Sequence, residues 1–148
     1  MKKIVLLCLT AFICLVSGTA KAQDTYGRIF NRAQADSLFG PILAFYTFDS
    51  AKVDRFMEKA GTHIMFNLKN GKIVILNSRR GIIYSDRNDT AIDSSEVFSN
   101  FSTSIFRELL SKGKKNTIFI EKRPEVISIT NGDVTMETAR PCPPYCPD

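Results

Sequence analysis

The segment THIMFNLKNGKIVILNSRRGIIYS, residues 62–85, decides the fold. Over residues 62–69 apolar side chains recur at every second position, which is the pattern of a β-strand. Asn70-Gly71 follows and is the strongest short signal for a tight hairpin, so residues 72–77 supply the returning strand. A second turn leads into an apolar strand over residues 81–85. The segment therefore predicts a three-stranded antiparallel meander.

The chain before this segment predicts a buried strand followed by a helix. Residues 42–48 (ILAFYTF) are apolar and aromatic without helical spacing, which is typical of a strand buried on both faces. Asp49-Ser50 then offers a helix N-cap and Gly61 a helix C-cap. Between these caps apolar residues recur three and four positions apart, so one stripe of the helix should face the sheet. A shorter helix is predicted over residues 31–39, where Gly40-Pro41 ends it.

The chain after the meander repeats much of this pattern. Asp93 and Glu96 fit a capping box, and apolar residues at helical spacing predict a helix that continues from there to Gly113. Three further strands are predicted, over residues 116–122, 125–130 and 133–137. The last of these is expected to lie at a sheet edge, where it would be free to accept a partner strand.

The order of these elements predicts the fold class. Most strands follow one another through short turns, so the sheet should be largely antiparallel. Helices must cover a sheet face to bury their apolar stripes. The sequence therefore predicts an α+β domain with a largely antiparallel sheet of about five to seven strands and two or three helices packed on one face. Each half reads helix, glycine, strand and Asn-Gly hairpin, so an internal duplication is an open alternative.

The N-terminal 22 residues have the layout of a secretory signal peptide. Lys2 and Lys3 precede an apolar run over residues 4–16, and Ala20-Lys21-Ala22 is a small-x-small cleavage motif. A transmembrane helix needs roughly 20 apolar residues, so an uncleaved anchor is the less favoured alternative. Three segments follow from this: residues 1–22 are a cleaved signal, residues 23–138 a single α+β domain and residues 139–148 a Pro/Cys-rich tail. The mature chain should lack a transmembrane segment and work in the periplasm or outside the cell.

Charge argues against nucleic acid as a partner. The full chain carries a formal net charge of +5, and loss of Lys2, Lys3 and Lys21 lowers it to +2. Proteins that bind nucleic acid need a clustered basic face. The nearest candidate cluster consists of Lys112, Lys114, Lys115, Lys122 and Arg123. We favour a basic helix end over a binding site as the explanation of this cluster.

The C-terminal tail has the one unusual composition in the chain. Cys142 and Cys146 are the two thiols that remain after signal cleavage, and prolines surround them. In an oxidising compartment the favoured interpretation is a structural disulfide between them, which would stiffen the tail. A redox-active pair, a metal site and a disulfide between chains are the alternatives. The chain from Thr138 onward is expected to be irregular.

Residue types that enzymes concentrate are scarce. His63 is the one histidine, so a Ser-His-Asp or Cys-His arrangement would have to use it, and we favour an exposed or hydrogen-bonded strand histidine. GxSxG, GxxxxGK[ST], GxGxxG and HExxH are all absent. Residues 86–96 are acidic, but Ala91 and Val97 occupy the positions where an EF-hand needs glycine and glutamate. The sequence therefore assigns no catalytic, cofactor-binding or metal-binding residue.

One modification site is proposed from the sequence. Asp89-Thr90-Ala91 resembles a short O-glycosylation motif of secreted bacterial proteins, and Thr90 should lie in an exposed loop. A chance match is the competing explanation.

Together these features predict a small, exported, non-catalytic binding or accessory protein of the bacterial cell envelope. Its expected partner is another envelope or extracellular protein, or a ligand. One alternative is a small secreted hydrolase that uses carboxylates on envelope polysaccharide, and another is a structural protein with a disulfide-linked tail. An exposed apolar patch would favour binding, whereas an acidic cleft would favour the hydrolase.

Overall fold

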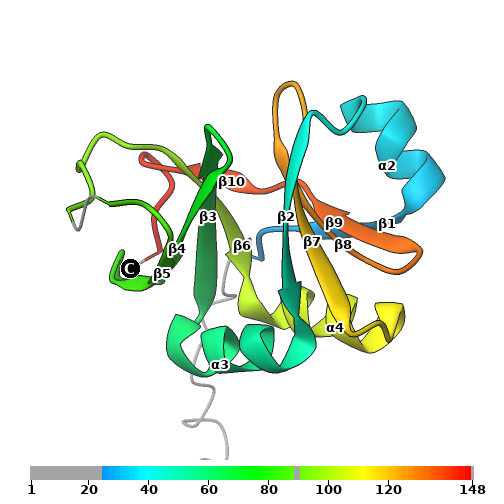
Figure 1. The fold of residues 1–148 in the computed structure, drawn as a ribbon, viewed down its shortest axis with the longest axis horizontal. Coiled ribbons are helices and arrows are strands. Elements are labelled where there is room, and N and C mark those ends of the chain that lie inside the picture. The colour runs from blue at the N-terminus through cyan, green and yellow to red at the C-terminus, as the bar shows by residue number, and fades with distance from the viewer. Residues whose placement is uncertain (1–24, 89–90, 148) are drawn as a thin grey trace, which may run out of the picture.

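The computed structural model describes residues 25–88 and 91–147 (Figure 1). Within these ranges the chain forms three helices: α2 (Arg32–Phe39), α3 (Ser50–Ala60) and α4 (Thr103–Gly113). Sheet A contains β1 (Arg28–Asn31), β2 (Ala44–Asp49), β7 (Thr117–Lys122), β8 (Ile127–Asn131) and β9 (Val134–Glu137). Sheet B contains β3 (His63–Lys69), β4 (Lys72–Asn77), β5 (Ile82–Ser85), β6 (Phe98–Ser102) and β10 (Arg140–Cys142).

Every strand pairing in both sheets is antiparallel, so the predicted α+β class is confirmed. The strand order is β1-β9-β8-β7-β2 in sheet A and β10-β6-β3-β4-β5 in sheet B. The strands thus divide between two five-stranded sheets, where the sequence predicted one sheet of about five to seven strands. The division follows from two long-range pairings, of β2 with β7 and of β6 with β3, which no local pattern reveals.

The two halves of the chain have the same topology. Each half consists of a strand, a helix and a three-stranded meander: β2-α3-β3-β4-β5 and then β6-α4-β7-β8-β9. The first strand of each half joins the meander of the other half, because β2 pairs with β7 and β6 pairs with β3. The repeated sequence pattern therefore corresponds to a repeated fold unit whose first strands are exchanged.

The main core lies between the two sheets, and α3 and α4 close it along one side (Figure 1). Its fully buried members come from both sheets and both helices, and include Ile64, Phe66, Phe101, Phe106, Leu109, Ile118 and Ile129. The hydroxyl groups of Tyr46 and Tyr84 lie 3.1 Å apart and connect β2 to β5. That hydrogen bond, together with burial, raises the pKa of Tyr46 above its ordinary value. The two sheets therefore share one core.

The central meander has the predicted strands and turns. Residues 63–69, 72–77 and 82–85 form β3, β4 and β5, and the Asn70-Gly71 turn has positive φ at both residues. Positive φ at both central positions is what a tight hairpin turn of this kind requires. The N-cap of α3 is also confirmed, since Asp49 Oδ1 accepts a hydrogen bond from the Lys52 amide at 2.7 Å.

The helix predicted from Asp93 to Gly113 is wrong over its first half. Residues 98–102 form the strand β6, and α4 begins only at Thr103. The strand β6 lies between β3 and β10 and is covered on both faces of sheet B. Phe101 belongs to the main core on one face, and Phe98 belongs to a smaller core on the other. Apolar residues buried on both faces of a short strand imitate helical spacing. Asp93 instead closes a local turn with the Ser95 amide.

Two expectations about strand edges and the tail also need correction. The strand β9 (Val134–Glu137) is not an edge strand, because β1 pairs with it along its whole length. The tail is not irregular throughout, because Arg140–Cys142 forms β10 against β6. Both errors concern strands of three or four residues, which are too short for a periodic signal. Sheet A ends instead at β1 and β2.

The side of sheet A turned away from the core is partly covered by α2 (Figure 1). Ala35 of α2 is fully buried, and the Phe39 ring packs edge-on against Phe30 of β1. The helix contacts β1 and β9, at one end of the sheet order. The part of this face over β7 and β2, at the other end, therefore stays open beside the helix.

Candidate functional site

A buried polar network occupies the outer face of sheet A, which is the face turned away from the main core. On β7, Glu121 lies opposite Ser128 of β8, and on β8 Thr130 lies opposite Thr135 of β9. All four side chains are buried. Polar side chains on the outer face of a sheet normally meet solvent, so this network exists because α2 and the chain after it cover part of that face.

Arg123 is the centre of this network. Its guanidinium is fully buried and donates hydrogen bonds to Ser128 Oγ at 2.9 Å, Asp36 Oδ1 at 2.9 Å and Glu121 Oε2 at 3.1 Å. It also donates to the carbonyl of Gly40, at the end of α2. The sequence placed Arg123 in a basic surface cluster, and the structure corrects this assignment. Arg123 instead fixes α2 to sheet A.

The two carboxylate oxygens of Glu121 have different surroundings. Oε2 accepts hydrogen bonds from Arg123, Ser128 and Thr130, at 3.0–3.2 Å. Oε1 is buried and has no hydrogen-bond donor among the residues that the structure describes. Arg32 Nη2 lies 3.6 Å from Oε1, which makes an ion pair but exceeds hydrogen-bond length. One oxygen of this buried carboxylate is therefore left without a hydrogen bond in the described part of the chain.

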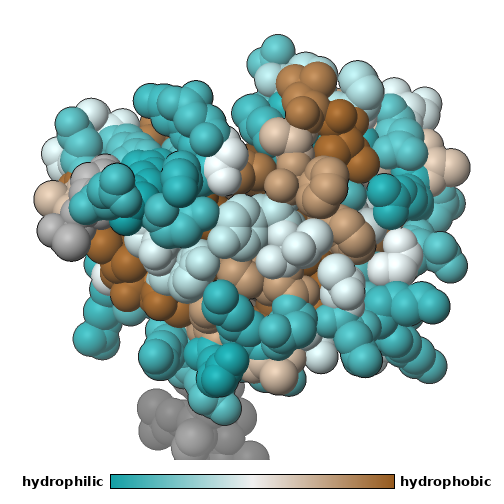
Figure 2. Space-filling model, viewed as in Figure 1, coloured by the Kyte–Doolittle hydropathy of each residue, from teal (hydrophilic) through white to brown (hydrophobic). Residues whose placement is uncertain are grey.

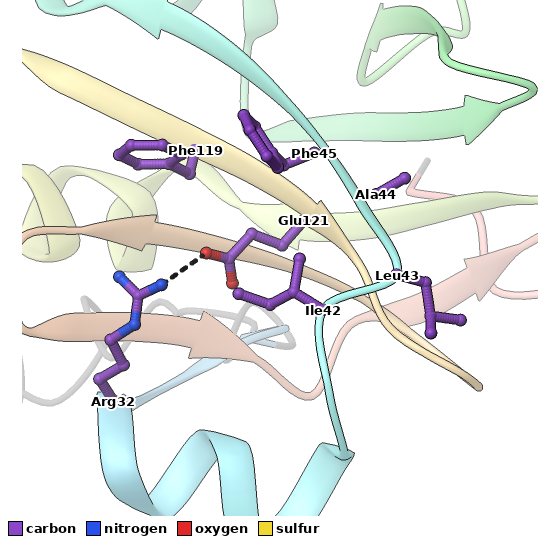
Figure 3. Close-up of a pocket in the computed structure, with 7 residues that line it drawn as sticks. All are labelled: Arg32, Ile42, Leu43, Ala44, Phe45, Phe119 and Glu121. Atoms are coloured by element: carbon purple, nitrogen blue, oxygen red, sulfur yellow. Dashed lines mark ion pairs between the residues drawn. The ribbon is translucent and has the colours of Figure 1, made fainter.

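Glu121 forms the floor of a pocket of about 440 Å³. The pocket is lined by Arg32, Ile42, Leu43, Ala44, Phe45, Phe119 and Glu121. In Figure 3 Arg32 and Glu121 point toward one another, and Phe45 and Phe119 lie on the far side of the carboxylate from Arg32. The walls come from α2, from the chain that leads into β2, and from β2 and β7. The pocket thus combines apolar walls with one carboxylate.

Apolar side chains extend from this pocket onto the surface. Leu43 is 62% exposed and Phe45 is 61% exposed, and the Phe45 ring lies 5.9 Å from that of Phe119. Figure 2 shows hydrophobic side chains at the surface around the upper end of β2. The sequence predicted a strand buried on both faces here, but Ala44, Phe45 and Thr47 are exposed. Exposed large apolar residues beside a pocket are typical of a binding surface.

A second buried carboxylate lies on the same face of sheet A. Glu137 of β9 accepts a hydrogen bond from the amide of Thr138, next to it in the chain. Burial raises the pKa of Glu137 above its ordinary value of 4.5, and these backbone hydrogen bonds and the charge of Arg123 act in the opposite direction. Glu137 is 3% exposed, so its carboxyl group lies within the fold rather than at the surface.

His63 is buried rather than exposed. Its ring nitrogens lie 3.0 Å from Thr62 Oγ1 and 3.3 Å from Ser102 Oγ, and the Tyr26 ring packs against it. Ser102 Oγ also accepts a hydrogen bond from the Tyr26 amide at 2.7 Å. Both side chains are 4% exposed, so this serine does not present its hydroxyl to solvent as a nucleophile would. We interpret the pair as a structural contact between β3 and β6.

The tail cysteines lie together. Cys142 Sγ and Cys146 Sγ are 1.98 Å apart, at disulfide bonding distance, and Cys142 is buried. The Arg80 guanidinium donates to the Cys142 carbonyl at 3.1 Å and to the Glu96 carbonyl at 3.1 Å, and it stacks over the Phe98 ring. The tail is thus held as the lid of a second, smaller core on the outer face of sheet B.

The remaining sequence-based candidates do not form a site. In the described part of the acidic segment, Asp86 accepts from the Ile73 amide and Arg87 pairs with Glu96. Across residues 25–88 and 91–147, no three His, Cys, Asp or Glu side chains gather as metal ligands would. Thr90, the proposed glycosylation site, and the signal peptide at residues 1–22 lie outside the described residues.

Comparison with protein-family models, curated proteins and solved structures gives no significant match for this chain. None of the described helices is both long enough and apolar enough to cross a membrane.

The residues of the pocket were missed by the sequence analysis. Arg32 and Glu121 are 89 positions apart and meet only after β1, β9, β8 and β7 are assembled in that order. The one local signal is the alternation of β7, which places Phe119 and Glu121 on the face opposite Ile118 and Ile120. An acidic residue on the outer face of a strand is ordinary, so this signal alone does not mark a site.

Proposed function

We propose that this protein is an exported, non-catalytic binding protein of the bacterial cell envelope, and that the surface around β2 contacts its partner. We call this the β2 surface and define it by Leu43, Phe45, Phe119 and the Glu121 pocket. The proposal rests chiefly on one observation: two large apolar side chains are more than half exposed at the mouth of a pocket. Such exposure is costly for a monomer unless a partner covers it.

The position of β2 at the end of sheet A supports the proposal. One residue beyond the paired ends of β2 and β7, the Ser50 amide donates to the Asn116 carbonyl at 2.8 Å. This hydrogen bond fixes which residues of β2 turn their amides and carbonyls toward β7. Hydrogen-bonded pairs alternate along an antiparallel ladder. The amides and carbonyls of Thr47 and Phe45 therefore point away from β7, toward the space where another strand would pair.

Export remains part of the proposal and rests on the sequence. Lys2 and Lys3, the apolar run and the Ala20-Lys21-Ala22 motif are the supporting features. We expect mass spectrometry of the protein from its native cells to give a chain that begins at Gln23. A chain that still carries residues 1–22 would contradict cleavage.

A carboxylate-dependent hydrolase is the second candidate, and it would use Glu121 and Glu137, two buried carboxyl groups on the outer face of sheet A. Glu137 is 3% exposed, however, and Glu121 Oε2 already accepts three hydrogen bonds. Inverting and retaining glycosidases both need two carboxyl groups that reach the substrate. Loss of hydrolysis of envelope polysaccharide in a Glu137→Gln variant would favour this candidate over binding.

Site-specific photo-crosslinking tests the binding proposal. A photo-reactive phenylalanine analogue replaces Phe45 in the full chain, and the protein is irradiated in the native cell envelope. We expect one adduct of defined mass, because the exposed side chain should lie against the partner. The matched control places the same analogue at Val97, which is 52% exposed and lies just before β6, in the other sheet. Equal labelling from both positions, or none from position 45, would overturn the proposal.

A further inference from the structure

We propose that the Glu121 pocket binds a lysine side chain from an extended segment of a partner protein, and that this segment pairs with β2 as an added strand. The inference rests on the proposed function, because it names the chemistry of the partner at the β2 surface. The ligand of the pocket is thus a primary ammonium group, and the contact with the partner is strand addition at β2.

Glu121 Oε1 is a buried carboxylate oxygen without a hydrogen bond within the described ranges. Glu121 is 1% exposed and lines the pocket, and its Oε1 is buried beside the Arg32 guanidinium without a hydrogen-bond donor from the described residues. A buried carboxylate oxygen without a donor costs free energy, so a ligand that donates to it is favoured. Arg32 approaches to 3.6 Å but is 45% exposed at its side chain, so a ligand can displace it without opening the core.

The charges around the floor also favour a cation. In the structure Arg32 and Arg123 together balance the carboxylates of Glu121 and Asp36, and once a ligand displaces Arg32 only the Arg123 guanidinium remains to balance them. The local excess is then negative. An anionic ligand in the pocket would lie against the buried Glu121 carboxylate. Two like charges at that distance repel each other strongly, so an anion is disfavoured.

The number of free acceptors distinguishes lysine from arginine. Glu121 Oε2 is already occupied by Arg123, Ser128 and Thr130, so the carboxylate offers one oxygen rather than two. A guanidinium fork is suited to two acceptors, whereas an ammonium is a compact charge that needs one. The apolar walls, including Phe45, Phe119 and Ile42, suit the methylene stem that a lysine side chain carries.

The register explains how a strand would deliver this side chain. Phe45 lies directly opposite Glu121, and both side chains are on the outer face of sheet A. A residue added opposite Phe45, with its side chain on the same face, would be two strand spacings from Glu121, or about 10 Å. Lysine and glutamate side chains together cover that distance, with the lysine stem lying across the exposed Phe45 ring. Shorter side chains do not.

The test uses the full mature chain and a short capped peptide, Ac-Thr-Val-Lys-Val-Thr-amide. Its matched controls carry norleucine, arginine or glutamate at the central position, and pentylamine serves as the free amine. Binding is followed by amide chemical shifts of the protein, which give both the site and the dissociation constant. We expect the lysine peptide to bind about tenfold or more tightly than the norleucine peptide, since a hydrogen bond to a charged group contributes this much.

Two protein variants test the pocket itself. Glu121→Gln should remove the difference between the lysine and norleucine peptides. Arg32→Ala, which removes a partly exposed side chain from the pocket wall, should tighten binding of the lysine peptide because it removes the competing cation. Weaker binding in Arg32→Ala, or preference for the glutamate peptide, would show an anion site and overturn the inference.

The remaining outcomes are equally decisive. Equal affinity for pentylamine and the lysine peptide would overturn strand addition, and no shift at β2 with any peptide would overturn the inference as a whole. Equal affinity for the arginine peptide would overturn the choice of lysine. In each of these cases a crosslinked adduct from position 45 would leave the proposed function standing. Absence of that adduct is the separate result by which the proposed function itself fails.

Discussion

Arg123 connects the outer face of sheet A to the helix that covers it. Its fully buried guanidinium contacts Asp36 and Gly40 at the α2 side and Glu121 and Ser128 at the sheet side. Burying a charge is favourable only when hydrogen bonds and an opposite charge compensate it. The same contacts leave Glu121 Oε2 with three hydrogen bonds and Oε1 with none from the described residues, so the network that stabilises α2 also shapes the floor of the pocket.

Removing the Arg123 side chain should destabilise the fold strongly. In Arg123→Ala the Glu121 carboxylate loses its buried partner, and loss of one member of a buried pair costs about 3–5 kcal/mol. Urea denaturation of the variant and of the wild-type chain measures the difference. The matched control is the exposed Arg79→Ala, for which we expect a change within about 0.5 kcal/mol. A similarly small loss in Arg123→Ala would contradict the role given to the network.

Glu137 should make stability depend on pH. Its pKa in the folded chain is raised by burial above the ordinary 4.5, so the folded state holds the proton more tightly than the unfolded state does. The resulting stabilisation is complete below the unfolded pKa and is lost as pH rises through the folded pKa.

The variant Glu137→Gln tests this sign, because glutamine keeps the shape and does not ionise. We expect the free energy of unfolding of the variant to exceed that of the wild type by an amount that grows as pH rises above about 4.5. Denaturation at a series of pH values measures the difference. A difference that shrinks with rising pH would mean that the pKa of Glu137 is lowered in the folded chain.

At the level of elements, the C-terminal tail completes sheet B. The strand β10 pairs with β6, and Arg80 holds the tail through the Cys142 carbonyl while stacking on Phe98. Met65, Val74 and Leu76 lie beneath Phe98 and Cys142 in the same small core. The tail is therefore part of the fold rather than an appendage, and Cys142 and Cys146 lie at disulfide bonding distance within it.

Arg80→Ala should loosen this lid. The guanidinium makes several hydrogen bonds to main-chain carbonyls, and we expect a loss of roughly 1–3 kcal/mol in the free energy of unfolding. Faster hydrogen exchange at the amides of β10 and β6 should accompany it. The neighbouring Arg79→Ala serves as control here as well. Unchanged exchange in β10 would show that the disulfide and the β6 pairing hold the tail without Arg80.

For the whole molecule, the exchange of first strands between halves makes the two sheets interdependent. A fragment of residues 25–88 contains β2 without β7 and β3 without β6. We expect this fragment to be unfolded alone and to fold when mixed with a fragment of residues 91–147, as seen by far-ultraviolet circular dichroism. A folded monomeric 25–88 fragment would contradict this interdependence.

The parts of the fold that the sequence predicted are those with local signals. The β3-β4-β5 meander followed from alternation and from Asn70-Gly71, and α3 followed from its cap and stripe. The strand β6 was missed because it is buried on both faces, and β1 and β10 were missed because they are short.

The candidate site was not predictable in the same way. Arg123 was grouped with nearby lysines as a basic helix end, because nothing in the local sequence shows that its guanidinium is buried against Asp36 and Glu121. Phe45 appeared buried, because an apolar run does not show which face of an edge strand has a cover. The pairing of Arg32 with Glu121 depends on the whole of sheet A, so local patterns contain no trace of it.

Amide hydrogen exchange at Phe45 and Thr47 tests whether a partner strand pairs with β2. Exchange is measured for the full chain alone and for the full chain saturated with the partner protein that crosslinking from position 45 identifies. Because these two amides point away from β7, we predict that they exchange fast in the free protein and slowly in the complex. Fast exchange at both amides in the complex, with new protection along β5 or β1 instead, would show that the partner does not pair with β2.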